Sequence, residues 1–275
     1  MEFKDRRKNR EARGDNRPRA YGEKAWREEK NATPDNYVYG RNAVKELFDS
    51  GRDVEKIYVQ QGEREGSINL LVALAVERKI PITQAEKSRL DKMAGSSRHQ
   101  GIIAVASEGS YSSIEEILEY AESRGEAPFI IVLDGVEDPH NLGAIIRSAE
   151  CAGVHGIIIP KRRAVGLTST VAKVSAGALM HMRVAKVTNI SVTIDELKEK
   201  GVWFYAADMD GKSLYKTEMK GAVGIVMGSE GFGISRLVKE KCDFVISIPQ
   251  YGCVNSMNVS CAAAVIMTEA TRQRH

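Results

Sequence analysis

Three short apolar runs in the second half of the chain constrain the fold most, because each leads through a loop containing glycine or proline into a segment with a helical pattern. They cover residues 130–133, 224–227 and 246–248. Strands that alternate with helices predict a parallel sheet covered on both faces, and such sheets bind ligands where strands end and helices begin. The sequence therefore predicts an α/β domain in which three loops line one ligand crevice.

Changes in composition divide the 275 residues into four parts. Residues 1–35 are dense in charge and poor in core-forming side chains, so they cannot repay the entropy of folding and are predicted to be a disordered basic arm. Residues 36–107 are predicted to form a small α/β domain, residues 108–125 a linker with one short helix, and residues 126–275 the α/β domain with the three loops.

The small domain shows short alternations of helical and strand patterns. They predict helices over 42–47 and 68–78, and strands over 54–59, 81–83 and 101–106. From composition alone, a near-neutral α/β unit of this size could be a protein-interaction domain.

The formal charge of +3 is unevenly distributed along the chain. Residues 1–30 hold 11 Lys and Arg against 7 Asp and Glu, an excess of +4, which leaves −1 for the remainder. Arg-rich segments bind RNA phosphates with salt-dependent affinity, whereas a solvated leader has no specific partner, and both interpretations of the arm stay open. The run Lys161–Arg163 after a predicted strand is a second candidate for phosphate contact, or an ordinary exposed turn.

Composition excludes several classes of protein. No apolar run reaches the roughly 18 residues of a membrane span, and the N-terminus is polar, so we expect a cytoplasmic protein. The four cysteines show no paired spacing and the five histidines occur singly, which argues against a metal site. Cys151 and Cys261 lie in apolar helical segments and are expected to be buried thiols.

The three loops carry motifs that resemble a known family. They read Asn-Leu-Gly-Ala-Ile-Ile-Arg-Ser over 141–148, Gly-Ser-Glu-Gly-Phe-Gly over 228–233, and a third motif from Ile248-Pro249 to Asn258-Val259-Ser260. In this order and spacing they resemble the SPOUT superfamily of RNA methyltransferases, and within it the TrmH-type ribose 2'-O-methyltransferases. The resemblance extends from about Asn36 to the end of the chain.

The resemblance implies S-adenosylmethionine as the cofactor, held in a C-terminal trefoil knot. It implies a small domain similar to ribosomal protein L30e that binds structured RNA, and a homodimer. It assigns cofactor contacts to Gly228, Ile248 and Met257.

For catalysis, the resemblance assigns Arg147 to the reaction centre. An arginine is essentially always protonated, so holding a phosphate and orienting the 2'-hydroxyl is a more economical role than that of a base. The other polar motif positions would orient Arg147, the ribose and the cofactor; they are Asn141, Glu230, Ser256 and Asn258. From residue type alone, Asn258 is equally suited to cap the last helix.

The implied reaction is 2'-O-methylation of a guanosine ribose in 23S rRNA. A tRNA ribose methyltransferase of the same family and a non-enzymatic RNA-binding chaperone remain alternatives. Nucleotide hydrolysis and dinucleotide-dependent oxidation are disfavoured, because the glycines of 228–233 follow neither the P-loop pattern nor GxGxxG.

Overall fold

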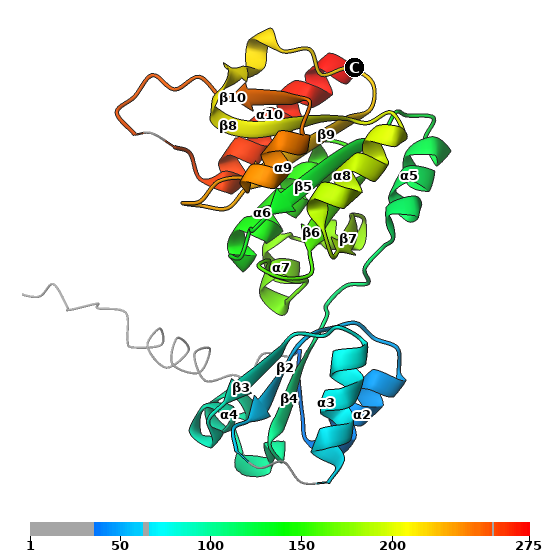
Figure 1. Ribbon diagram of the computed structural model, residues 1–275, viewed down its shortest axis with the longest axis vertical. Helices are drawn as coiled ribbons and strands as arrows, with labels where there is room; N and C mark the ends of the chain where they lie inside the picture. Colours follow the sequence, from blue (N-terminus) through cyan, green and yellow to red (C-terminus); the bar gives the residue numbers. More distant parts are fainter. Residues whose placement is uncertain (1–35, 63–65, 255) are drawn as a thin grey trace, which may run out of the picture. The chain divides into compact units, whose positions relative to one another are not determined.

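The computed structural model describes residues 36–62, 66–254 and 256–275 (Figure 1). The predicted arm over 1–35 lies outside the described residues and stays a prediction. The described chain contains two sheets, each with its own helices and core.

The smaller sheet has four strands in the order β1-β4-β2-β3. β2 pairs in parallel with β3 and antiparallel with β4, and β1 pairs antiparallel with β4. Its strands are β1 (Tyr37–Tyr39), β2 (Val54–Gln60), β3 (Ile82–Ala85) and β4 (Ile102–Ala106). Its helices are α2 (Arg41–Asp49), α3 (Ser67–Glu77), α4 (Lys87–Ala94) and the 3-10 turn η1 (Ser97–His99).

These elements agree with the helices and strands predicted for the small domain, with β1 and α4 in addition. Helix α4 was missed because it is short and polar and buries only Leu90 and Ala94. The main core of this sheet forms around the fully buried Phe48, Ile57 and Leu71.

The larger sheet has six strands, and every strand pair in it is parallel. The order is β10-β8-β9-β5-β6-β7, so neighbours in the sheet are often distant in the chain. This confirms the predicted α/β fold with a parallel sheet. The strands are β5 (Phe129–Asp134), β6 (Gly156–Pro160), β7 (Arg183–Val187), β8 (Trp203–Ser213), β9 (Val223–Gly228) and β10 (Phe244–Ser247).

Helices cover both faces of this sheet (Figure 1). One core joins the strands to α6, α7 and α10, and the other joins them to α5, α8 and α9. Burial on both faces explains why β5 is a run of apolar residues without alternation. The helices are α5 (Ile114–Ser123), α6 (Pro139–Cys151), α7 (Ser169–Val174), α8 (Ile190–Glu199), α9 (Arg236–Lys241) and α10 (Val259–Arg274), with 3-10 turns η2 (Ala178–Met180) and η3 (Leu214–Lys216).

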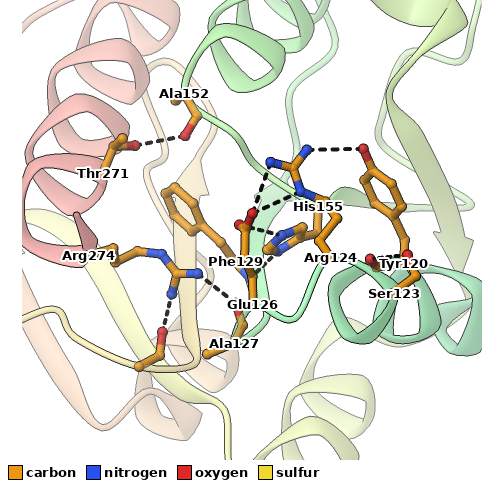
Figure 2. Close-up of polar contacts among 11 residues, drawn as sticks. Tyr120, Ser123, Arg124, Glu126, Ala127, Phe129, Ala152, His155, Thr271 and Arg274 are labelled. Carbon is orange, nitrogen blue, oxygen red and sulfur yellow. Dashed lines mark hydrogen bonds and ion pairs between the residues drawn. The ribbon is translucent and has the colours of Figure 1, made fainter.

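Hydrogen bonds tie the last helix to the edge of the sheet where the strands begin (Figure 2). Thr271 Oγ1 donates to the carbonyl of Ala152 over 2.8 Å, and the Arg274 guanidinium donates to the carbonyls of Ala127 and Gly221. The cation of Arg274 also lies over the ring of Phe129, 5.1 Å from its centroid. The carboxyl end of α10 is therefore held at the opposite edge of the sheet from the loops that carry the motifs.

Cys151 and Cys261 are exposed, so the prediction that they are buried is wrong; both lie on the outward faces of their helices, away from the strands. The trefoil knot stays a prediction. In the described ranges, no helix is long and apolar enough to cross a membrane, and no cluster of His, Cys, Asp or Glu has the arrangement of a metal site.

Candidate active site

Asn141 and Asn258 lie at the N-terminal ends of two helices, α6 and α10. Helix α6 begins after Asp138, whose side chain accepts from the His140 amide over 2.9 Å, with Pro139 at the first turn. Helix α10 begins after Asn258, whose Oδ1 accepts from the Ser260 amide over 2.9 Å. Asn258 therefore is the N-cap that its residue type suggested.

The same asparagine also belongs to a polar cluster. Its Nδ2 donates to Asn141 Oδ1 over 2.9 Å and to Glu230 Oε1 over 2.8 Å. Asn141 Nδ2 donates to that same carboxylate oxygen over 3.1 Å. We call Asn141, Glu230 and Asn258 the amide–carboxylate triad. Each comes from a different motif, so the three loops after β5, β9 and β10 meet at this point.

Two adjacent cavities share the triad region as a common wall. The first, of about 520 Å³, lies at the carboxyl ends of β9 and β10 and beside residues 207–209 of β8, and Asn258 lines it. The second, of about 760 Å³, lies at the carboxyl ends of β5 and β6 and after β7, and Asn141 lines it. Both are bounded by Ser229, Glu230, Gly233 and Val259. The predicted single crevice is thus divided in two by the loop that carries Glu230.

The first cavity collects the side chains assigned to the cofactor. Gly228, Ile248 and Met257 all line it, together with Ser256. A Cβ atom on Gly228 would lie 2.1 Å from the backbone of Gly233, so only glycine allows this loop to close against the end of β9. The walls are largely apolar with a few polar groups, which is the chemistry of a small-molecule site.

Arg147 is the one assigned catalytic residue that lies apart from the others. It is exposed on α6 and lines neither of the two cavities. It shares the outward face of the helix with His140 and Cys151, which are also exposed. Within this chain, the structure brings together Asn141, Glu230, Ser256 and Asn258 but not Arg147.

Asp208 and its neighbours line the first cavity and were not singled out from the sequence. Lys239 Nζ lies 2.8 Å from both Asp208 Oδ2 and Asp210 Oδ1. Burial raises the pKa of Asp208, but the donated hydrogen bonds from Lys239 and the Met209 amide outweigh it, so the pKa lies below its usual range. The signal was present, because Asp208 directly follows the apolar start of β8, as Gly228 ends β9.

Two family models match this chain, one over the part that forms the larger sheet and one over the part that forms the smaller sheet. Residues 128–268 match the SpoU rRNA Methylase family, and residues 37–112 match a family described as RNA 2'-O ribose methyltransferase substrate binding. A relative in Staphylococcus haemolyticus, described as a TrmH family tRNA/rRNA methyltransferase, is 46% identical over 239 residues, which is 86% of this chain and 96% of the relative. YacO of Bacillus subtilis, with the same description, is 43% identical over 241 residues, 87% of this chain and 96% of its own.

Solved structures share the fold at lower sequence identity. The SpoU methyltransferase AviRb from Streptomyces viridochromogenes, in complex with AdoMet, is 21% identical with a TM-score of 0.55, covering 86% of this chain and 89% of that one. An AdoMet-bound rRNA methyltransferase from Sinorhizobium meliloti is 22% identical with a TM-score of 0.54, covering 90% of each chain.

Proposed function

Because the chain belongs to the SpoU rRNA methylase family, we propose that it transfers a methyl group from S-adenosylmethionine to the 2'-hydroxyl of a guanosine ribose in 23S rRNA. The observation that supports this best is the amide–carboxylate triad, which stands between two adjacent cavities. Methyl transfer requires the acceptor oxygen and the methyl carbon to be held close together and in line, so the donor and the acceptor must bind in adjoining spaces. Two cavities with one shared wall provide this arrangement.

The first cavity suits the cofactor. Ile248 and Met257 offer apolar walls for an adenine ring, and Gly228 allows close backbone approach. When bound, the cofactor supplies a methyl group on a positively charged sulfur, so that an O–C bond forms, an S–C bond breaks and the hydroxyl proton is released. The chain's own contribution is to position the two reactants and to exclude water.

The triad would orient the ribose at the boundary. Glu230 Oε1 is committed to two amide donors, which fixes the direction of the carboxylate. Ser256 lies in the first cavity beside Met257, on the loop that precedes Asn258. We assign orientation of the ribose and of the methionine end of the cofactor to Asn141, Glu230, Ser256 and Asn258.

We further propose a homodimer in which Arg147 serves the site of the partner subunit. This side chain lines neither cavity of its own chain, yet the resemblance to TrmH-type enzymes assigns it to the reaction centre. In a two-fold dimer, the exposed face of α6 would meet the partner, and an arginine there could hold the RNA phosphate across the interface.

The choice of 23S rRNA over tRNA as the substrate rests on sequence resemblance. The sequence resembles RlmB, the bacterial enzyme that methylates a guanosine ribose in 23S rRNA, whereas the named relatives are described only as tRNA/rRNA methyltransferases. The region matching a substrate-binding family, residues 37–112, would dock on structured RNA. An rRNA substrate would also place the enzyme in the cytoplasm. A tRNA substrate remains the second candidate.

Primer-extension mapping of 2'-O-methyl sites in rRNA and tRNA from a deletion strain tests the substrate. We expect one site to vanish in 23S rRNA and to return when the purified enzyme and S-adenosylmethionine are added. An RNA carrying 2'-deoxyguanosine at that site should bind but accept no methyl group, since only the nucleophile is removed. Continued methylation of the deoxy RNA would show that the acceptor is a base atom, and binding of RNA without cofactor binding would favour a chaperone.

A further inference from the structure

The loop from Ser229 to Gly233 is a closed and stiff element. The Ser229 amide donates to the Gly233 carbonyl and the Gly233 amide donates back to the Ser229 carbonyl, both over 3.0 Å. Gly231 and Gly233 have positive φ values of 92° and 67°, which glycine adopts without strain. These hydrogen bonds fix the backbone of the loop, so the side chains of the loop point in defined directions.

Two side chains of this loop have different environments. Glu230 is held in the triad, whereas Phe232 is 96% exposed and lines the second cavity. A phenylalanine ring left in water forgoes the free energy that its burial would release. Held on a stiff loop beside a cavity, this ring is positioned to be covered by a ligand.

The second cavity carries both acidic and basic side chains. Its wall contains four carboxylates, of which three are already engaged as acceptors: Asp134 by the Ser235 amide, Asp138 by the His140 amide, and Glu230 by the triad. The cations of the wall are Arg162 and Arg163, both exposed. Among the residues that the structure describes, neither guanidinium forms an ion pair or a hydrogen bond. The carboxylates keep their negative charge, and the two unpaired guanidinium groups are the cations of the wall that can bind a phosphate.

We propose that Phe232 stacks on the base of the nucleotide being methylated, and that this base leaves its own stack to enter the second cavity. Arg162 and Arg163 then contact the phosphates beside it. This inference rests on the proposed function. Unstacked RNA bases bind to exposed aromatic rings, and extrusion of a nucleotide from its stack is known for enzymes that modify a base.

The position of the cavity agrees with the chemistry. The 2'-carbon of a ribose is adjacent to the carbon that carries the base. If the 2'-hydroxyl faces the first cavity over the shared wall at Glu230, the base projects to the other side of that wall, beside Phe232. A volume of about 760 Å³ is within the range of roughly 300–1,000 Å³ that is usual for small-ligand sites.

A double-mutant cycle between the ring and the base tests this. The probes are an RNA hairpin that spans the mapped methylation site and the same hairpin with an abasic ribose at the target. For the intact hairpin, Phe232→Leu should weaken binding by about ten- to a hundredfold, the usual value of one stacked base, while Phe232→Tyr and Phe232→Trp retain it. For the abasic hairpin, wild type and Phe232→Leu should bind alike.

Tyr215→Leu serves as the matched control, because Tyr215 is an exposed aromatic residue that lines neither cavity. It should bind both hairpins as the wild type does. Calorimetry should give an unchanged cofactor affinity for Phe232→Leu, and sedimentation an unchanged oligomeric state.

The remaining outcomes separate this inference from its premise. Equal loss on both hairpins, or no loss on either, would overturn the stacking role while leaving methyl transfer intact. Dissociation of an oligomer in Phe232→Leu would instead assign the ring to a contact between subunits and overturn it as well. If the wild type methylates no RNA, the proposed function fails and this inference fails with it.

Discussion

Asn258 performs two tasks with the two ends of one amide. Its Oδ1 accepts from the amides of Ser260 and Cys261 and so caps α10, while its Nδ2 donates to Asn141 and Glu230. An asparagine suits both because it carries an acceptor and a donor on the same group. A cap and a site residue can therefore coincide, and substitutions can separate the two roles.

Serine keeps the cap but lacks the amide donor. We predict that Asn258→Ser changes the free energy of unfolding by less than about 1 kcal/mol and abolishes most methyl transfer, whereas Asn258→Ala also destabilises the fold by about 0.5–2 kcal/mol. Urea denaturation and a single-turnover methylation assay measure the two effects. If Asn258→Ser transferred methyl groups at the wild-type rate, Asn258 would be a cap and nothing more.

His155 is a buried residue whose protonation is opposed by burial and by the hydrogen bond that it accepts from the Phe129 amide (Figure 2). Its Nδ1 accepts from the Phe129 amide over 2.9 Å, so Nε2 carries the proton and faces Glu126 Oε2 at 3.2 Å. Burial lowers the pKa of His155 below its usual value; Glu126 opposes this shift, and the cations of Arg274 and Arg124 add to it. The folded protein thus favours the neutral ring.

A lowered pKa makes stability depend on pH in a definite direction. In the unfolded chain the pKa of His155 is about 6.5, and below that pH the unfolded chain binds a proton that the folded chain resists. The contribution of the neutral ring to the free energy of unfolding is therefore fully present above about pH 6.5. It is lost as the pH falls toward the lower pKa of the folded state. We predict that His155→Asn, which keeps an acceptor near the Phe129 amide, flattens this decline. Urea midpoints measured from pH 7.5 to about 5 check it; parallel curves for the two proteins would contradict it.

At the scale of elements, the loop after β9 depends on a close approach that only glycine permits. A Cβ on Gly228 would lie 2.1 Å from the carbonyl carbon of Gly233, whereas a Cβ on Gly252 would meet nothing within 4 Å. We predict that Gly228→Ala opens the loop, removes cofactor binding and destabilises the fold by about 1–3 kcal/mol. Calorimetry with S-adenosylmethionine should show the loss, with Gly252→Ala as the neutral control. Normal affinity in Gly228→Ala would mean that the loop does not shape the cofactor cavity.

At the scale of the whole molecule, the proposed dimer predicts that two inactive variants restore activity when they are paired. A heterodimer of one Arg147→Ala chain and one Asn258→Ser chain, isolated by two affinity tags, holds one complete site if Arg147 acts across the interface. It should regain about half of the wild-type rate, although each parent homodimer is inactive. If Arg147 acts within its own chain, both sites of the heterodimer stay defective and no activity returns.

The basic arm supplies the second prediction for the whole chain. Deletion of residues 1–30 removes the excess of +4, so affinity for RNA should fall and its dependence on salt should become shallower. Cofactor affinity should not change. Filter binding from about 50 to 200 mM salt gives the slope, and an unaltered slope would leave the arm as a solvated leader.

The amino-acid sequence by itself determined the alternation of strands and helices and the identity of the three loops. Burial on both faces makes a strand such as β5 an uninterrupted apolar run, and an N-cap such as Asp138 before Pro139 marks a helix start. These signals are local, because they depend on residues adjacent in the chain. A short element with a mixed pattern, such as α4, was missed for the same reason.

Only the tertiary structure decided which side chains share a site. The sheet order places β8 between β10 and β9, so Asp208 joins the first cavity although it lies outside all three motifs. In the tertiary structure, Arg147 and Cys151 are exposed on α6. Glu230 lies between two cavities, where the sequence predicted a single crevice. The physical reason is that parallel strands are joined by crossovers, so neighbours in the sheet are not neighbours in the chain, and no local pattern records which loops will meet.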